Sequence, residues 1–112
     1  MENCLFCKIA AGEIPSNKAF EDDRVLAFYD IAPQAPVHIV VIPKAHIADG
    51  VRDINAENAD TVAHIFEVIP QIAKEVGISD YRIVSNNGED AGQTIPHLHF
   101  HILGGRRLGE MG

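Results

Sequence analysis

The sequence predicts an α+β domain in which a five-stranded, largely antiparallel sheet packs with a short N-terminal helix and one long helix. Three observations lead to this fold class. Five short segments are rich in β-branched and aromatic residues, most connections between them are of hairpin length, and a single long segment has helical periodicity. The 112 residues, 46% of them hydrophobic, suit one domain over residues 1–112 with a modest core.

The first predicted elements are a helix and a hairpin. Residues 4–11 carry apolar side chains at helical spacing, and Gly12 and Pro15 end the pattern, so we expect a short amphipathic helix that covers the sheet. Two apolar and aromatic runs follow, Lys18–Glu21 and Val25–Tyr29. Because acidic, turn-forming residues separate them, these runs are predicted to pair as a β-hairpin.

Three more strands complete the expected sheet. Residues 37–42 are rich in β-branched types and stop at Pro43, which has no N–H for a strand ladder, so they are predicted to form a central strand. Residues 81–85 and 98–103 have similar patterns, and the polar, glycine-bearing segment 86–94 is expected to join them as a loop.

The long helix is expected to follow Asn55, which has the side chain of an N-cap, and to end at Gly77 as the C-cap. Pro70 inside it predicts a kink. Apolar residues recur along it at intervals of three and four: Ala59, Val62, Ala63, Phe66, Ile69, Ala73 and Val76.

Charge and cysteine content narrow the class of protein. A formal charge of −7, with no run of Lys or Arg, disfavours long nucleic acids and anionic membranes as partners. Residues 1–7 lack the pattern of a signal peptide, and no apolar run approaches the roughly 20 residues that span a bilayer. A disulfide between Cys4 and Cys7 would close too short a loop to stabilise much. We therefore expect reduced thiols and a cytoplasmic location.

Three alternating histidines are the strongest sign of chemistry. On a strand, His97, His99 and His101 would lie on one face, and the alternating Leu98, Phe100 and Ile102 on the core face. Imidazole can attack phosphorus or transfer protons near neutral pH, and a neighbouring imidazole can fix its tautomer. Two alternatives are a solvated face of an edge strand and a zinc-binding face.

The segments that adjoin the histidines suggest a nucleotide site. Gly88 and Gly92 could bring backbone N–H groups close to a phosphate, and Gln93 and Thr94 could add side-chain donors, although an ordinary loop is the alternative. Asp30 follows a predicted strand, where its carboxylate could accept from ribose hydroxyls. Phe28 and Ile31 beside it could enclose a base or belong to the core.

A second cluster is predicted at the N-terminus. Cys4 and Cys7 have the two-residue gap that lets two thiolates reach one metal, and His46 and His97 could complete a Cys2His2 zinc site. Such a closed site would be structural and would leave His99 and His101 free. The alternative is that both thiols pack as small hydrophobes. His64 flanks the apolar stripe of the long helix and is expected to be a surface residue.

Five sequence blocks together resemble the histidine-triad family. They are F-x-K-I from Phe6, E-I-P from Glu13, A-F-Y-D-I-A-P-Q-A-P from Ala27, H-I-V-V-I-P-K from His38 and H-L-H-F-H-I-L-G-G from His97. The order of the blocks and the L-G-G-R ending most resemble the branch of histidine-triad nucleotide-binding proteins that hydrolyse purine nucleoside phosphoramidates. The resemblance implies a homodimer whose sheet continues across the two subunits.

The resemblance also implies roles for single residues. His99 would be the nucleophile that carries a covalent nucleotidyl group, His101 and His38 would contact the phosphate and move protons, and the backbone carbonyl of His97 would orient His99. The phosphate and leaving group would be held by Asn86, Gln93 and Thr94, the ribose by Asp30, and the purine base by Leu5, Phe6, Ile9, Phe28 and Ile31.

The expected function is hydrolysis of a purine nucleoside phosphoramidate to a nucleoside monophosphate and an amine, with no cofactor needed for catalysis. One alternative is hydrolysis of dinucleoside polyphosphates. Another is a nucleotide- or zinc-binding regulatory module with little turnover. There are two departures from the family pattern. Pro96 stands where relatives often have an aromatic residue and bears on the shape of the entry to the site, and the short end at Met111 and Gly112 bears on leaving-group preference.

Overall fold

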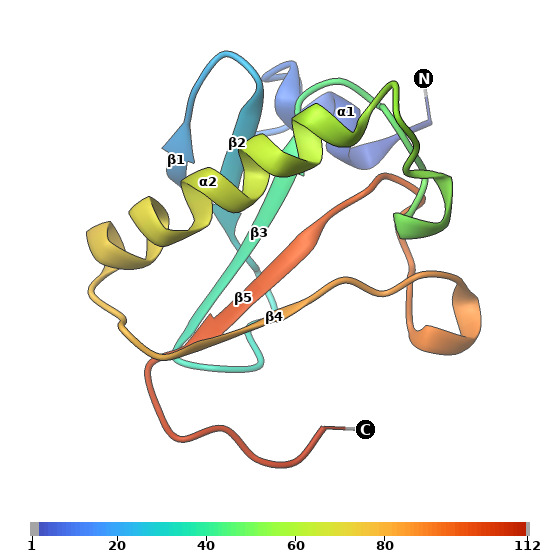
Figure 1. Cartoon of the computed structure of the whole chain (residues 1–112). Helices are drawn as coiled ribbons and strands as arrows, with labels where there is room; N and C mark the ends of the chain where they lie inside the picture. The colour runs from blue at the N-terminus through green and yellow to red at the C-terminus, as the bar shows by residue number, and fades with distance from the viewer. Residues whose placement is uncertain (1–2, 112) are drawn as a thin grey trace.

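The computed structural model describes residues 3–111 and contains the predicted α+β architecture. Its strands form one five-stranded sheet in the order β1-β2-β3-β5-β4, and every pairing is antiparallel (Figure 1). The elements, in chain order, are α1 (Leu5–Ala10), β1 (Lys18–Glu21), β2 (Val25–Tyr29), β3 (Val37–Pro43), η1 (Val51–Asp53), α2 (Ala59–Val76), β4 (Tyr81–Val84), η2 (Glu89–Ala91) and β5 (Phe100–Gly104).

The two helices cover opposite faces of the sheet. The long helix α2 packs on one face over the larger core cluster, which includes Ile39, Val41 and Ile102 of β3 and β5. On the other face, Phe6 and Ile9 of α1 pack against a smaller apolar cluster that contains Val40 of β3. Because successive side chains of a strand point to opposite faces, β3 contributes to both clusters.

The helix α2 begins later than the sequence suggested. Its N-cap is Asn58, and the predicted cap, Asn55, instead closes the turn before the helix by accepting from the backbone N–H of Glu57 through Oδ1 (2.8 Å). The helix runs without interruption through Pro70 and ends at Gly77, whose φ of 81° is the left-handed conformation of a glycine C-cap. Within residues 3–111, no helix has the length and hydrophobicity needed to cross a bilayer.

The buried face of α2 differs in part from the predicted stripe. Ile69 and Ala73 are buried as expected, whereas Phe66 is 46% exposed and Ala63 is exposed. The buried residues are Ile65, Val68, Ile69, Ile72 and Ala73. Apolar residues therefore occupy more than one side of this helix, and spacing alone does not identify the side that packs on the sheet.

The last two strands are shorter than predicted. Strand β4 ends at Val84, and β5 begins at Phe100, so His97, Leu98 and His99 precede the regular strand. Their side chains still alternate, because Leu98 lies in the core under α2 while the two histidine rings lie on the α1 face. Strand β5 is paired on both sides, by β3 and β4. The interpretation of the histidines as the solvated face of an edge strand is therefore wrong.

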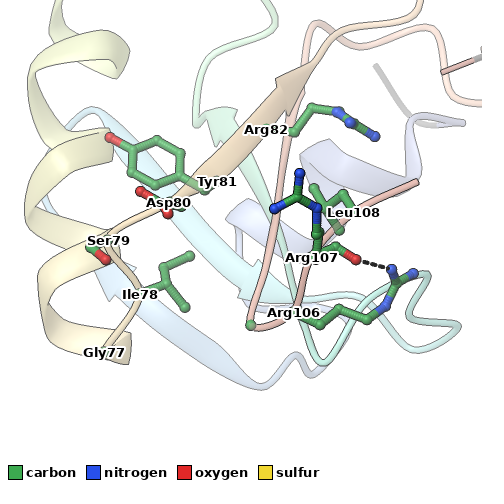
Figure 2. A pocket seen from close by; sticks show the side chains of 10 residues that line it. Gly77, Ile78, Ser79, Asp80, Tyr81, Arg82, Arg106, Arg107 and Leu108 are labelled. Carbon is green, nitrogen blue, oxygen red and sulfur yellow. Dashed lines mark hydrogen bonds between the residues drawn. The ribbon is translucent and has the colours of Figure 1, made fainter. Parts of the chain in front are cut away.

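A groove lies beside β4, away from the histidines. It has a volume of about 610 Å³ and is lined by 77–82 and 105–108 (Figure 2). Arg82 and Arg106 both line it and are hydrogen-bonded to backbone carbonyls of the C-terminal segment. No histidine contributes to this groove, so the chemistry predicted from the sequence belongs elsewhere.

Candidate active site

The predicted catalytic histidines meet on the α1 face of the sheet. His101 on β5 lies opposite Val40 in the β3–β5 register, and His38 is two residues before Val40 on β3, so their side chains share one face. The ring centroids of His99 and His101 are 5.0 Å apart, as are those of His38 and His101. The structure thus brings together His38, His99 and His101, the residues to which the resemblance assigns phosphate chemistry.

The surroundings of His99 fix which of its nitrogens carries a proton. Its Nδ1 lies 2.7 Å from the backbone carbonyl oxygen of His97, and a carbonyl oxygen can only accept. Nδ1 therefore carries the proton, and Nε2 of the neutral ring has a free lone pair. The ring is buried, and Phe6 packs edge-on against it with centroids 5.0 Å apart. This is the tautomer that a nucleophilic histidine needs.

A chain of hydrogen bonds sets the tautomer of His101 as well. The backbone N–H of Gln34 donates to Nδ1 of His38 (3.0 Å), so the proton of His38 is on Nε2. That Nε2 lies 2.8 Å from Nδ1 of His101 and therefore donates to it, which leaves the His101 proton on its own Nε2. Oδ2 of Asp30 is 3.6 Å from the same His38 nitrogen. His101 thus has an N–H that is free to donate to a bound phosphoryl oxygen.

Burial keeps these rings neutral near pH 7. It lowers the pKa of His101 to about 4, with further lowering by the neighbouring charges of His99 and His38 and a partial opposing effect of Asp30. Burial also lowers the pKa of His38 and His99, against the opposing influence of Asp30. A neutral ring is required both for attack on phosphorus and for the hydrogen-bond chain described above.

The low pKa of His101 predicts that the folded protein becomes less stable as the pH falls. A histidine that titrates near 6.5 when unfolded and near 4 when folded contributes stability above pH 6.5, which is lost as pH falls from 6.5 towards 4. We expect this group to account for up to about 3 kcal/mol of unfolding free energy. Urea denaturation at pH 7.5 and pH 5 measures the loss. The loss should be smaller in His101→Gln, and an unchanged loss in that variant would contradict the assignment.

The second predicted cluster also forms. Sγ of Cys4 and Sγ of Cys7 lie 3.2 and 3.5 Å from Nδ1 of His97, and Sγ of Cys7 is 3.6 Å from Nδ1 of His46. Nε2 of His97 lies 2.9 Å from the carbonyl oxygen of Pro43, so the proton of that ring is on Nε2. His97 therefore turns an unprotonated Nδ1 towards the two sulfurs.

His46 is held in the same way by a carboxylate. Its Nε2 lies 2.7 Å from Oδ1 of Asp49, which places the proton there and the lone pair on Nδ1, facing Cys7. A histidine whose remote nitrogen donates to a carboxylate or carbonyl is the usual arrangement of a metal ligand. The four ligand atoms of Cys4, Cys7, His46 and His97 lie within 4.8 Å of one another.

The pKa values of the two thiols shift in opposite directions in this environment. Burial alone would raise the pKa of Cys4, but hydrogen bonds with Cys7 and the nearby His46 lower it overall. Burial and the hydrogen bond with Cys4 raise the pKa of Cys7 to about 11. The pair therefore favours one thiolate beside one thiol until a cation neutralises both, which is a property of metal-binding cysteines.

A similar set of groups at Asp30, His38 and His101 does not fit a metal equally well, although its ligand atoms also lie within 4.8 Å. Nδ1 of His38 accepts from the Gln34 amide, so its Nε2 carries a proton and has no lone pair for a cation. Metal binding there would have to break this hydrogen bond. The histidine tautomers thus distinguish the two groups: those of His38 and His101 suit proton transfer, and those of His46 and His97 suit metal binding.

The polar groups of the loop before the triad make more hydrogen bonds within the protein than expected. Gln93 uses its whole amide within the protein: Nε2 donates to the carbonyls of Asp49 (2.6 Å) and Ile95 (3.0 Å), and Oε1 accepts from the Gly88 N–H (2.8 Å). The Gly92 N–H donates to the Glu89 carbonyl. The side-chain donors of Gln93, which were predicted to reach a phosphate, are thus engaged in closing the loop in this structure.

Other predicted contacts of the phosphate and the base lie in varied surroundings. Asn86 is half-buried and Thr94 is exposed, so both have accessible side chains. Phe6, Ile9 and Phe28 are buried and Leu5 is 40% exposed, whereas Ile31 is fully exposed next to Asp30. The buried members form an apolar floor of packed side chains, and Leu5 and Ile31 remain available to contact a ligand directly.

Sequence reasoning missed three roles. Asp49 orients His46, and an acidic residue three positions after a histidine is a signal that could have found it. The Gln34 N–H that fixes His38 is a backbone donor and leaves no trace in the sequence. His64 is half-buried rather than a surface residue, because its Nε2 lies 2.6 Å from Oδ2 of Asp22, joining α2 to the β1–β2 turn.

Comparison with known proteins agrees with this geometry. Residues 11–108 match the model of the HIT domain. The chain is 43% identical to a purine nucleoside phosphoramidase of Escherichia coli K12, over 98% of this chain and 93% of that protein. It is similar in structure to a histidine triad protein of Clostridium difficile (51% identity, TM-score 0.94, 100% and 98% of the two chains) and to a HIT family hydrolase of Clostridium thermocellum (46%, 0.94, 99% and 97%).

Proposed function

The chain belongs to the HIT-domain family of hydrolases, and from this premise we propose that it hydrolyses purine nucleoside phosphoramidates through a covalent nucleotidyl-histidine. The observation that carries the proposal is the buried His99, whose Nδ1–H is held by the His97 carbonyl so that Nε2 offers its lone pair. The similarity to a phosphoramidase supports the substrate class.

In the proposed first step, Nε2 of His99 attacks phosphorus, a phosphorus–nitrogen bond to the ring forms, and the bond to the amine breaks. The amine leaves after gaining one proton from solvent. In the second step, water attacks the nucleotidyl group, the bond to Nε2 of His99 breaks, the proton lost by the water returns to solvent, and the nucleoside monophosphate and neutral His99 are released. The Nε2–H of His101 donates to a phosphoryl oxygen while His38 supports its tautomer. Donors fixed in advance in a buried site stabilise developing charge without reorganisation.

Substrate binding is proposed to use the accessible groups around this centre. Asp30 follows β2 and, through one carboxylate oxygen, already accepts from the Ala32 N–H (2.8 Å), so its second oxygen is the one available to a ribose hydroxyl. Leu5 and Ile31 would contact the purine base above the apolar floor that contains Phe28. Asn86 and Thr94 would contact the phosphate, with Gln93 holding their loop in place.

A product assay tests the proposal. The intact protein is incubated separately with adenosine 5′-phosphoramidate and with a diadenosine polyphosphate, and products are resolved by ion-exchange chromatography. We expect AMP and ammonia from the first substrate at a much higher kcat/KM than any product from the second. Faster cleavage of the polyphosphate would favour the alternative hydrolase. Tight binding of both nucleotides without turnover would favour a binding module.

We further propose that Cys4, Cys7, His46 and His97 hold a structural Zn²⁺. The support is chemical: two sulfurs and two unprotonated Nδ1 atoms converge, and both histidines have their other nitrogen bound to an oxygen acceptor. When bound, the metal would supply cross-linking and charge neutralisation. Catalysis would need no cofactor. Because zinc thiolates persist in reducing compartments, this site also supports a cytoplasmic location.

Metal analysis of the purified protein tests the zinc proposal. We expect about one Zn²⁺ per chain in the unchelated protein, since a closed Cys2His2 set binds zinc tightly at neutral pH. Cys4→Ser should lose most of it, whereas the same analysis of Ser85→Ala, outside the cluster, should leave the content unchanged. A clearly sub-stoichiometric content in the unchelated wild type would argue against a resident zinc.

A homodimer is proposed through the edge strand β4. Among residues 3–111, strand β4 is paired on one side only, so the backbone groups of its outer side could pair with a second copy. Ile83 on β4 is 37% exposed and lies opposite Ile102, which places it on the face of the sheet that α2 covers. An unpaired strand with an exposed apolar side chain supports a continued sheet.

Sedimentation measurements test this assembly. The wild type is expected to sediment as a dimer, and Ile83→Glu as a monomer, because a charge at the apolar edge would be desolvated next to its symmetry mate. Val51→Glu is the matched control, since Val51 has similar exposure (43%) but lies on η1. A dimer that persists in Ile83→Glu, or a monomeric wild type, would contradict the β4 interface.

A further inference from the structure

His97 belongs to both clusters. Its ring closes the group formed by Cys4, Cys7 and His46, while its backbone carbonyl oxygen receives the Nδ1–H of His99 at 2.7 Å. The residue therefore joins the metal cluster to the nucleophile directly, through one backbone unit. Any movement of the His97 backbone changes the hydrogen bond that fixes the tautomer of His99.

The segment that carries this carbonyl is not held by the strand ladder. Strand β5 begins at Phe100, so His97 and His99 lie in irregular backbone. The N–H groups of His97 and Leu98 donate to the carbonyls of Ile95 and Ala48, both in loops. Side chains therefore supply much of the anchoring of this segment: Leu98 packs in the core, and Ser85 donates to the His99 carbonyl (2.8 Å). The ring of His97 is the side chain that joins the segment to α1 and to the end of β3.

Phe6 adds a second connection between the clusters. It lies on α1 between the two cysteines, is buried, and packs edge-on against both His97 and His99, with centroids 5.9 and 5.0 Å apart. The position of α1 depends on Cys4 and Cys7 at its first turn. Fixing the two sulfurs therefore also fixes the aromatic ring that limits the rotation of the His99 side chain.

We propose that the Cys4–Cys7–His46–His97 cluster, when it holds its metal, is a positioning device that keeps His99 in the reactive Nδ1–H tautomer. The inference rests on the proposed function for its catalytic consequence, but its structural part concerns His99 alone. The metal makes no contact with substrate. Its loss allows the segment at His97 to move, so that His99 samples both tautomers and several orientations. Turnover then falls more than affinity does, because Asp30 and Ile31, which follow β2, lie outside both α1 and the segment at His97.

The test combines metal titration with a direct measurement of the His99 ring. In ¹⁵N-histidine-labelled protein, long-range ¹H–¹⁵N spectra report which ring nitrogen is protonated. We expect one Nδ1–H tautomer for His99 in the zinc-loaded protein and an averaged signal after chelation. Over the same titration, kcat for adenosine 5′-phosphoramidate should fall about 10- to 100-fold, with a smaller change in KM, and Zn²⁺ should restore both.

Two variants keep the test decisive if the chelated wild type unfolds. Asp49→Asn retains all four ligands but removes the carboxylate that orients His46, so metal occupancy can be varied at a milder chelator concentration. In it, kcat and the His99 signal should both follow occupancy. Val68→Ala, a buried change in α2 on the opposite face of the sheet, lowers stability and should affect neither.

A His99 signal that stays in one tautomer while zinc is removed from folded protein would overturn the inference. If the zinc-loaded wild type shows no turnover at all, the proposed function fails, and the spectra still decide whether the cluster positions His99. A loss of kcat in Val68→Ala equal to that in metal-depleted Asp49→Asn would also overturn it, because destabilisation alone would then explain the loss.

Discussion

Replacing His99 by alanine is expected to lower kcat for adenosine 5′-phosphoramidate by about 10⁴-fold or more, because the variant has no group that can carry the nucleotidyl intermediate. Of the three histidines at the proposed phosphate site, His38, His99 and His101, His99 alone has a buried ring whose Nδ1–H is fixed by a backbone carbonyl and whose Nε2 is unengaged. Water would have to attack phosphorus directly, with only the remaining donors to stabilise charge. Steady-state kinetics on metal-loaded protein measures the loss.

Two controls separate this effect from damage to the fold. His64→Ala removes the same ring from α2, outside the site, and should leave kcat within about two-fold once the protein is shown to be folded. The affinity of His99→Ala for AMP should change less than about ten-fold, since the base and ribose contacts remain. Substantial turnover by His99→Ala would rule out the covalent route and would transfer the nucleophile's role to another group.

The alternation of histidine and apolar residues was sufficient to predict which side of the chain carries chemistry. Leu98, Phe100 and Ile102 are in the core under α2, and the histidines lie on the other face, as the period of two requires. The start of β5 was predicted less well. Residues 97–99 keep the extended alternation but pair with loop backbone instead of a neighbouring strand, and no local pattern separates these two cases.

The protonation pattern of the site could not be predicted from the sequence, because each tautomer depends on a partner distant in the chain or on a backbone group. His97 donates to the Pro43 carbonyl, 54 residues away, and His38 is set by the Gln34 amide. Residue types and spacing indicate that imidazoles are close together. Only the folded backbone decides which nitrogen is a base and which is a donor.

In the polar loop of residues 86–94, residue type suggested a role in ligand binding that the side chain uses within the protein instead. Gln93 was predicted to donate to a phosphate because its residue type and its place before the triad both suit that role. In the structure, both its donors and its acceptor close the loop that leads into His97. A buried amide is most stable when every polar atom has a partner, and the loop backbone supplies such partners more readily than a transient ligand. A glutamine in this position stabilises the entry to the site.

The long helix was predicted from its periodicity, yet its orientation was partly wrong at Phe66. Helical spacing identifies an apolar stripe, but α2 has apolar residues on a second side as well, and the sheet selects Ile65, Val68 and Ile72. The exposed Phe66 still contacts Phe100 edge-on, with centroids 5.2 Å apart. The rest of its ring surface is exposed on the outer side of α2.

Truncation of Leu98 should be the most damaging change to stability that leaves every histidine in place. Its side chain is fully buried between α2 and the sheet, and its N–H donates to the Ala48 carbonyl at 2.9 Å. Leu98→Ala should therefore lower the free energy of unfolding by about 3 kcal/mol, because it removes buried apolar surface and leaves a cavity that the close-packed surroundings fill only in part. Urea denaturation at pH 7.5 measures the change, and the melting temperature should fall by roughly 10 °C.

Leu5→Ala is the matched control, since it deletes the same atoms from a side chain that is 40% exposed on α1. It should cost less than about 1 kcal/mol, because an exposed side chain loses little burial and leaves no closed cavity. Equal losses in the two variants would mean that Leu98 does not occupy the core. Since His97 and His99 flank Leu98, a large loss in Leu98→Ala alone would show that this side chain anchors the segment on the core face, in addition to the contacts that the His97 ring makes on the other face.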